Sequence, residues 1–488
     1  MISRVKAAVS QLVGGAASSG GPGPRSGQEQ RPKFPYSRPP FLHLSEEEAQ
    51  RAADHSNRPI VVPGQGRRTL LPWDTGYAEV INAGKSALNE DQAAREVVFV
   101  ARRRPMSSAA DGKDEQSADK EREGIEFHYW ALFDGHAGTG AAVMASRLLH
   151  LHICDQLRDI VGVLRDCDVP PPICLTSEAG TVSGEAAKGP PHQGDWEPPT
   201  DSEARFLLEK EISHEYLVIG AIENAFCQMD KQIEREQHSH CILGGCCALA
   251  VVYLLGKIYV ANAGDSRAIL IRSGDTFPLS SEFTPESERQ RLQYLGYLQP
   301  HLLGNEFTHL EFPRRIQHRE IGRKMLFRDY SMTGWAYKTI EEDDLKFPLV
   351  YGEGKKARVM ATIGVTRGLG DHDLKVHCSN IHIKPFLSCI PEVKVYDVTK
   401  YEHGVDDVLV LGTDGLWDVI SDREVADAVT RVLSNCEPDN PSRFTLAAED
   451  LVMRSRGILK ERGWRLSNDR LGSGDDISVF VIPLYGHM

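Results

Sequence analysis

Apolar positions repeat with two different periods along this chain. Near 127–133 and 246–262, short apolar runs are bounded by glycine or polar residues, which is typical of buried strands. Across 140–164 and 217–233, apolar residues recur every three or four positions, which predicts helices with one buried face. Further strands are predicted within 58–101 and at 268–272, 276–278, 359–362, 393–396, 408–412 and 477–482, and further helices at 419–433 and 445–460. Because strands come in neighbouring runs with helices grouped between them, we expect an α+β fold with antiparallel sheets.

The first 40 residues differ in pattern from the rest of the chain. Residues 1–13 place apolar residues at helical spacing beside Arg4 and Lys6, which predicts a short amphipathic helix on an anionic membrane surface. A frayed terminus without a role is the alternative interpretation. Residues 14–40 are rich in Gly, Ser and Pro, as flexible linkers are.

One domain is expected from residue 41 to residue 488, with interruptions. Segments 102–124 and 168–204 are polar and lack apolar periodicity, so both are predicted to be disordered insertions. Segment 302–356 is long and aromatic with little clear periodicity, and its structure is left open by the pattern.

Composition narrows the class of protein. The chain has 488 residues and a net charge of −13, and an acidic protein lacks the positive footprint that nucleic acid requires. No run approaches the roughly 20 apolar residues of a membrane span, and no signal peptide is evident. The 10 cysteines have neither disulfide-framework nor zinc spacing, so we expect free thiols in a reducing compartment. These features predict a cytoplasmic protein, with residues 1–13 as a peripheral contact on a cytosolic membrane face.

Acidic residues beside glycine border several of the predicted strands. They are Asn89-Glu90-Asp91, Asp134-Gly135-His136, Gly264-Asp265-Ser266-Arg267, Asp414-Gly415 and Gly474-Asp475-Asp476. Any single Asp-Gly is usually a turn. Several carboxylates at strand ends that converge would repel one another, and a divalent cation is their natural counter-charge. The set therefore predicts a metal site built on oxygen ligands.

These motifs resemble those of the metal-dependent protein phosphatases, the protein phosphatase 2C family. Phe133-Asp134-Gly135-His136-Ala137-Gly138 is similar to the family's DGHxG signature, and the other motifs occur in the family's order from about Tyr77 onward, with Thr366–Asp371 and Thr413–Asp418 among them. The segment TGYAEVINAGKS and the text near Gly334-Trp335 are similar to the branch with H-, J- and M-type forms, most of all the J-type (zeta) form.

The resemblance implies a central antiparallel β-sandwich flanked by helices, with a metal cluster at one end. Two or more Mn²⁺ or Mg²⁺ ions are implied per subunit. Asp134 would bridge two ions, the backbone carbonyl of Gly135 would bind one of them, and Asp414 and Asp475 would bind the other. Asp265 would hold a third ion together with Asp414.

Three further acids complete the implied site. Glu90 and Asp91 would act through bound waters, and Asp371 would be a supporting acid near the cluster. A water that bridges the ions would lose its proton and attack phosphorus, so that phosphoserine and phosphothreonine in proteins are hydrolysed without a covalent intermediate. His136 is the candidate general acid for the departing oxygen, and a structural histidine in a turn is the alternative.

One position departs from the family pattern. Many relatives have a phosphate-binding arginine four residues before the first motif's glutamate, where this chain has Ser86 with Lys85 beside it. Lys85 is a candidate phosphate contact, but an ammonium lacks the fork geometry of arginine. For Arg367, by contrast, a buried structural ion pair is expected rather than a phosphate contact.

Segment 302–356 occupies the place of the family's flap, which lies near the active site and helps to select substrates. Candidates for contacts with an acidic phosphoprotein surface are Arg314, Arg315, Arg319, Arg323 and Lys324. Candidates for anchoring a partner, or a second subunit of a homodimer, are Trp335, Tyr337 and Tyr351, and packing within the flap is the alternative. Two other functions compete with the phosphatase. A pseudophosphatase would use the same fold only for binding, and a metallo-nuclease would be expected to show a basic groove.

Overall fold

The computed structural model describes residues 38–45, 47–48, 57, 59–61, 71–86, 89–102, 124–165, 172–177 and 207–485. The expected amphipathic segment 1–13 and the linker up to residue 37 lie outside these residues, as does nearly all of the insertion 102–124. Of the insertion 168–204, the structure describes 172–177, where β5 (Ile173–Ser177) pairs with β6 (Leu207–Glu211). In the described part of the chain, no helix is long and apolar enough to cross a membrane.

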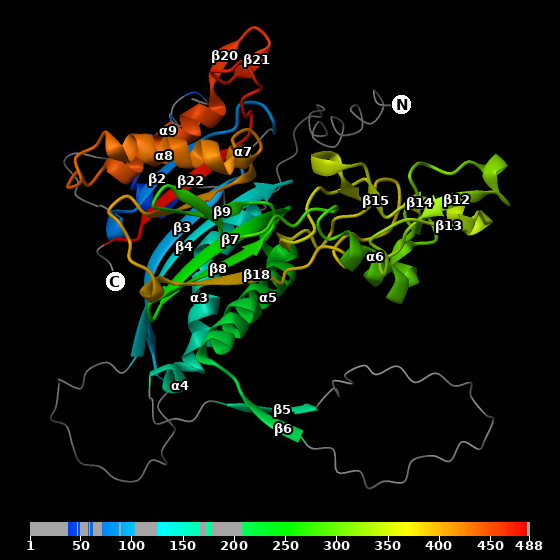
Figure 1. The fold of residues 1–488 in the computed structure, drawn as a ribbon, viewed down its shortest axis with the longest axis horizontal. Coiled ribbons are helices and arrows are strands. Elements are labelled where there is room, and N and C mark those ends of the chain that lie inside the picture. Colours follow the sequence, from blue (N-terminus) through cyan, green and yellow to red (C-terminus); the bar gives the residue numbers. More distant parts are fainter. Residues whose placement is uncertain are drawn as a thin grey trace, which may run out of the picture.

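Two antiparallel sheets form the centre of the molecule (Figure 1). The first runs β1 (Ile60–Val61), β2 (Gly76–Val80), β22 (Ile477–Pro483), β19 (Val408–Gly412), β9 (Arg267–Arg272) and β10 (Asp275–Pro278). The second runs β18 (Glu392–Asp397), β8 (Lys257–Ala263), β7 (Gly245–Leu254), β4 (Gly124–His136) and β3 (Gln92–Ala101), and the short β17 (Leu369–Gly370) also pairs with β7.

Side-chain alternation along the strands builds a core on both faces of each sheet. In β19, Leu409 and Leu411 join Trp130 and Phe480 in the core between the sheets. Val408 and Val410 of the same strand face the other way. Because both faces are covered, the strands read as continuous apolar runs in the sequence.

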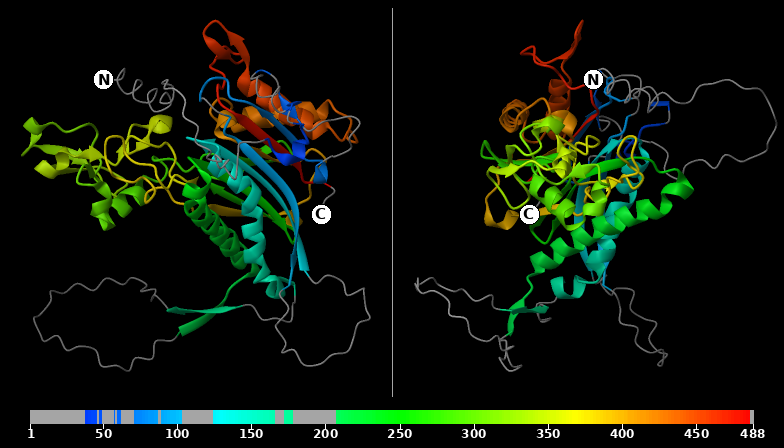
Figure 2. Two further views of the ribbon diagram at one scale, coloured as in Figure 1. Left: turned by 180° about the vertical axis from the view of Figure 1, so that it is seen from behind. Right: turned by 90° about the vertical axis from the view of Figure 1, so that its right-hand side faces the viewer.

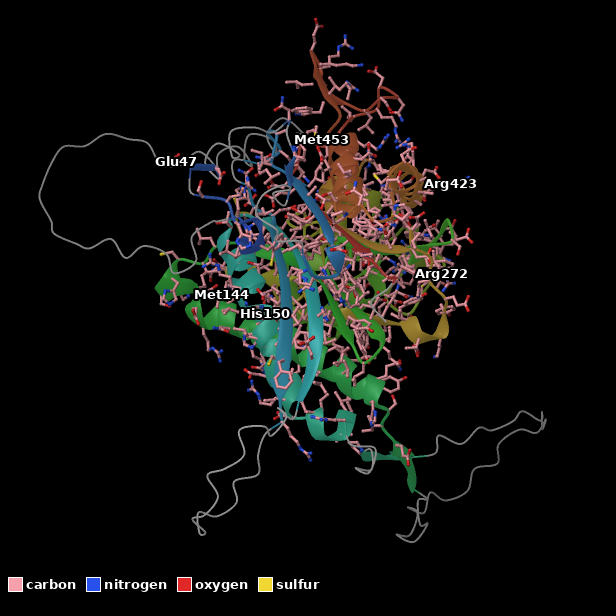
Figure 3. The ribbon with its side chains drawn as sticks, turned by 90° about the vertical axis from the view of Figure 1, so that its left-hand side faces the viewer. Glu47, Met144, His150, Arg272, Arg423 and Met453 are labelled. Carbon is pink, nitrogen blue, oxygen red and sulfur yellow. The ribbon has the colours of Figure 1, made fainter. Side chains whose placement is uncertain are left out.

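Helices cover the outer faces of the sandwich (Figures 1 and 2). α3 (Gly140–Arg158), α4 (Val161–Arg165) and α5 (His214–His240) share a core with the second sheet. α7 (Asp414–Trp417), α8 (Asp422–Ser434) and α9 (Arg443–Arg456) share a core with the first. The side-chain view in Figure 3 places Met144 on the helical layer beside the second sheet and Met453 on that beside the first. The predicted α+β sandwich flanked by helices is therefore confirmed.

Several element boundaries differ from the predicted ones. The helix expected at 419–433 begins at Asp422, because the Ser421 side chain caps it together with Glu424. The helix expected at 445–460 ends at Arg456, where Gly457 has a φ of 74°. The strand expected at 359–362 is wrong beyond Val359.

The cause of that early strand end is local backbone geometry. Met360 and Ala361 have φ values of 45° and 55°, so the chain turns after β16 (Arg358–Val359) instead of continuing as a strand. Similarly, the apolar helix expected over 140–164 is interrupted by a turn at 159–160, between α3 and α4.

A lobe extends from one side of the sandwich (Figure 1). It contains α6 (Arg289–Leu298) and the short strands β11 (Phe307–Thr308), β12 (Lys324–Phe327), β13 (Ala336–Thr339), β14 (Phe347–Pro348), β15 (Val350–Tyr351) and β16. Its own small core includes Leu292, Phe307, Leu349, Ile383 and Phe386. The segment 302–356, where we expected the flap, is thus the outer part of a larger lobe that starts at α6.

Candidate active site

Three aspartates from three different strand ends meet at one edge of the sandwich. Asp134 lies near the end of β4, Asp265 follows β8, and Asp414 follows β19 at the start of α7. One carboxylate oxygen from each lies within 4.8 Å of those of the other two. The backbone N–H of Asp414 also donates a hydrogen bond to Asp134 Oδ2 over 3.2 Å, which joins the two sheets at this point.

Asp475 reaches the same place from the segment just before β22, the strand beside β19. The Lys85 ammonium contacts the Asp475 carboxylate, and its Nζ lies 3.5 Å from Asp414 Oδ2. A backbone hydrogen bond holds the loop that carries Lys85 against the segment of Asp475, since the N–H of Ala83 donates to Gly474 O over 2.9 Å. Lys85 therefore pairs with carboxylates of the cluster in this structure, and its contact with substrate phosphate stays a prediction.

The cluster concentrates negative charge in a half-buried place. Burial, followed by the neighbouring carboxylate of Asp414, raises the pKa of Asp134 well above its usual range. Burial and the charge of Asp265 raise the pKa of Asp414 to about 8, and burial also raises that of Asp265. Carboxylates with pKa values raised in this way lack sufficient positive charge nearby, and their oxygens are the donors that Mn²⁺ and Mg²⁺ prefer. The residues present therefore fit a divalent metal site.

Glu90 and Asp91, two acidic neighbours of the cluster, have different surroundings. Glu90 Oε1 accepts a hydrogen bond from the backbone N–H of Gly138 over 2.7 Å, which fixes the turn after β4. Asp91 is buried, and its Oδ2 accepts from Thr413 Oγ1 and Ser478 Oγ over 2.9 and 2.8 Å. Glu90 lines the cavity at the cluster. Asp91 does not line it and instead connects the end of β19 to the start of β22 through its hydrogen bonds.

Gly135 brings the chain close to this turn. A Cβ at residue 135 would lie 2.4 Å from the carbonyl oxygen of Glu90, so no larger residue fits without a backbone shift. Its carbonyl as a metal ligand stays a prediction, as do the water-mediated roles of Glu90 and Asp91.

His136, the last residue of β4, pairs with Asp371. His136 Nε2 lies 2.7 Å from Asp371 Oδ2. Burial alone would lower the pKa of His136, but the charge and hydrogen bond of Asp371 raise it above its usual value. Gly245 makes room for the pair, because a Cβ there would lie 2.3 Å from Asp371 Oδ2. Asp371 is thus a supporting acid that acts on the histidine.

Asp230 and Lys384 hold the backbone beside Asp371. Asp230 of α5 accepts hydrogen bonds from the N–H of Gly370 over 2.9 Å and from Lys384 Nζ over 2.8 Å. Lys384 Nζ also donates to the carbonyl of Gly370 over 2.8 Å. This network connects the loop that carries Asp371 to α5, one of the helices that cover the second sheet.

A cavity of about 420 Å³ joins these groups. Of the residues predicted for the site, all except Asp91 line it: Lys85, Glu90, Asp134, Gly135, His136, Asp265, Asp371, Asp414 and Asp475. Residues 362–365, at the base of the lobe, form part of its wall. The structure therefore brings together nine residues that are spread over nearly 400 positions of the sequence.

Comparison with known proteins decides the family. A family model described as Protein phosphatase 2C matches residues 198–310 and 346–454. The human protein named Protein phosphatase 1H is 60% identical over 517 residues, which cover 99% of each chain. The chain belongs to the protein phosphatase 2C family.

Two branches of the family are close to this phosphatase. Human Protein phosphatase 1J is 59% identical over 471 residues, covering 96% of this chain and 89% of that one. The rat protein of the same name is 56% identical over 517 residues. These identities confirm the predicted H/J-type branch, and their similarity gives the J-type form no precedence over the H-type form. Like its relatives, this chain is a protein phosphatase, and its substrates are phosphoproteins.

Sequence reasoning missed several groups around the phosphatase site. Cys247 of β7 lines the cavity, and its thiol donates a hydrogen bond to Asp265 Oδ1 over 3.2 Å. Asp476 accepts the backbone N–H groups of Asn82 and Glu90 over 2.7 and 2.8 Å. The adjacency of Asp476 to Asp475 was a usable signal, whereas nothing in the sequence places Cys247 beside Asp265.

The expected ion pair of Arg367 is confirmed. Its Nη2 and Nε lie 2.8 and 3.1 Å from Glu288 Oε1, and its guanidinium stacks on Phe283. Replacing Arg367 with alanine should lower the free energy of unfolding by about 2–3 kcal/mol, because the buried Glu288 loses one arginine partner and keeps Arg291 and the Thr366 hydroxyl. Denaturant unfolding would measure this loss. The KM for a phosphopeptide should change less than twofold, and a tenfold rise with normal stability would instead indicate a phosphate contact.

Three of the candidate contact residues of the lobe make contacts within the lobe itself. Arg314 pairs with Glu320, and the Arg315 guanidinium lies 4.1 Å from the ring centroid of Phe347. Trp335 lies under Arg328, 4.7 Å from its guanidinium. These three contacts agree with packing inside the flap, whereas Tyr337 and Tyr351 are exposed, so a partner contact of the lobe stays a prediction.

Proposed function

We propose that this phosphatase hydrolyses phosphoserine and phosphothreonine in proteins with the help of Mn²⁺ or Mg²⁺ ions, two or more per subunit. The observation that carries the proposal is the convergence of Asp134, Asp265 and Asp414, whose oxygens lie within 4.8 Å of one another. Asp475 lies on the same cavity and completes the set of carboxylates. When bound, the ions supply an activated water as nucleophile and neutralise charge on the phosphoryl oxygens.

The chain's own residues supply the proton and the orientation. His136 donates a proton from its imidazolium to the serine or threonine oxygen as that oxygen leaves phosphorus. Asp371, 2.7 Å away, keeps the ring protonated and fixes its direction. Asp230 and Lys384 hold the loop of Asp371 in place through Gly370, so the acid is positioned before substrate arrives.

The lobe contributes to the substrate side of the cavity. Residues 362–365 line the same cavity as the acidic residues. Lys355 Nζ, in the same lobe, lies 2.6 Å from Oδ1 of Asp418, the last residue of the Thr413–Asp418 motif. Because residues next to the lobe and residues of the sandwich line one cavity, a phosphorylated side chain bound there would contact both, which supports a role of the lobe in substrate selection.

The decisive experiment measures phosphate release from phosphothreonine, phosphoserine and phosphotyrosine peptides by the purified chain, with EDTA, Mg²⁺ or Mn²⁺. We expect release from the first two peptides only, and only with metal. A folded protein that releases no phosphate from any peptide or from a small aryl phosphate would overturn the proposal in favour of the pseudophosphatase. Release that continues undiminished in EDTA would contradict the metal assignment.

A further inference from the structure

Two cysteines lie in contact where α5 packs near the second sheet. Cys227 is on α5, and Cys389 is in the segment that leads into β18. Their sulfur atoms are 3.7 Å apart, and the Cys389 thiol donates to the Cys227 sulfur. Both are free and half-buried. They lie 162 positions apart in the sequence (389 − 227), so only the tertiary structure makes them neighbours.

We propose that Cys227 and Cys389 form a peroxide-sensitive dithiol, which oxidises to a disulfide that fastens the segment before β18 to α5. A disulfide has an S–S distance of about 2.05 Å, so closure requires a relative movement of about 1.7 Å. Cys389 lies in an irregular segment rather than in a strand or helix, which favours such a small adjustment. The proposal does not rest on the phosphatase reaction.

The hydrogen bond assigns the two sulfurs different roles. Cys389 donates its proton toward Cys227, so we assign Cys227 as the sulfur that reacts first with hydrogen peroxide. Burial raises the pKa of Cys389 to about 12, which agrees with its role as the proton-bearing partner. The apolar core of α3 and α5, on which Cys389 packs, covers one side of the pair.

The oxidation proceeds in two balanced steps. Cys227 sulfur attacks one peroxide oxygen, the O–O bond breaks, and a sulfenic acid and one water result. Cys389 sulfur then attacks Cys227 sulfur, the S–S bond forms, the S–O bond breaks, and the hydroxyl leaves as water with the proton of Cys389. Overall two thiols lose two electrons and two protons, and one peroxide is reduced to two waters.

The cross-link would act on a segment that reaches the active site. Cys227 and Asp230 lie three residues apart on α5 and so share a face of the helix. Asp230 holds Gly370, next to Asp371. The segment of Cys389 is itself hydrogen-bonded to the same loop, since the N–H of Ser388 donates to Thr366 O over 3.0 Å. The disulfide therefore adds a covalent connection beside this hydrogen bond.

The test treats the reduced full-length chain with hydrogen peroxide, alkylates the remaining thiols and maps the peptides. We expect a peptide pair joined through Cys227 and Cys389, and a rise in melting temperature of at least about 3 °C that dithiothreitol reverses, because the cross-link closes a long loop. Cys227→Ser and Cys389→Ser should each lose both effects. The double variant Cys241→Ser, Cys378→Ser, which removes two exposed thiols, should retain them.

Three results would overturn the proposal. One is that Cys227 and Cys389 both remain open to alkylation while the exposed Cys241 is oxidised. Another is a disulfide to a different cysteine. The third is a Cys227–Cys389 disulfide that leaves the melting temperature unchanged, since the segment would then not be fastened. Peptide mapping of the unsubstituted chain distinguishes the first two even where a serine variant fails to fold.

Discussion

Replacing Asp414 with asparagine should lower kcat/KM for a phosphothreonine peptide by roughly 10³-fold or more, because a metal ligand worth several kcal/mol of transition-state stabilisation is lost. Asp134→Asn should have at least as large an effect, since Asp134 is the implied bridging ligand. The matched control is Asp439→Ala, which removes an exposed carboxylate far along the chain from any motif and should leave the rate unchanged. Initial rates at saturating Mn²⁺ or Mg²⁺ give the comparison.

The same variant separates loss of chemistry from loss of fold. In the metal-free protein the pKa of Asp414 is raised from its ordinary value of 3.8 to about 8. Between these values the folded chain keeps a proton that the unfolded chain has lost, so stability falls as pH rises through this window. Asp414→Asn removes that contribution, and the metal-free variant should melt at or above the parent's temperature at pH 8. Normal activity would refute the assignment of Asp414 as a metal ligand, whereas a variant that melts far lower would show that its lost activity reflects loss of fold.

His136→Gln should reduce kcat for the phosphothreonine peptide by about 10²–10⁴-fold, the usual contribution of a general acid. The loss should be much smaller with p-nitrophenyl phosphate, because its leaving group departs without protonation. An equal loss on both substrates would indicate that His136 has a structural role. Metal-dependent thermal stabilisation should persist in the variant, since the carboxylate cluster is intact.

The positioning role of Asp371 should appear in the pH profile of kcat. Asp371 raises the pKa of His136, so it keeps the imidazolium populated to higher pH. Asp371→Asn should therefore move the alkaline limb of kcat to lower pH, because the acid form is lost earlier. A profile that keeps its limb while kcat falls would mean that Asp371 does not act through His136.

Local patterns in the sequence determined the elements that form the sandwich. Apolar runs with glycine between them located β4, and the hairpins β7–β8 and β9–β10, and helical spacing located α5. These predictions worked because both faces of each sheet are buried, so the apolar signal is strong. Ends of elements were less predictable, since they depend on single capping residues such as Ser421 or on left-handed backbone such as that of Met360.

The sequence by itself also determined which residues make the site. Carboxylates beside glycine at strand ends, together with the family motifs, predicted ten site residues, and nine of these line the cavity. Only the tertiary structure decided how they are paired. Asp371 faces His136, Lys85 lies against Asp475, and Asp91 supports two strands from behind. The contact of Cys227 with Cys389 is decided in the same way. A strand end is a property of the local chain, whereas these partners are set by sheet register and loop docking, which join segments hundreds of positions apart.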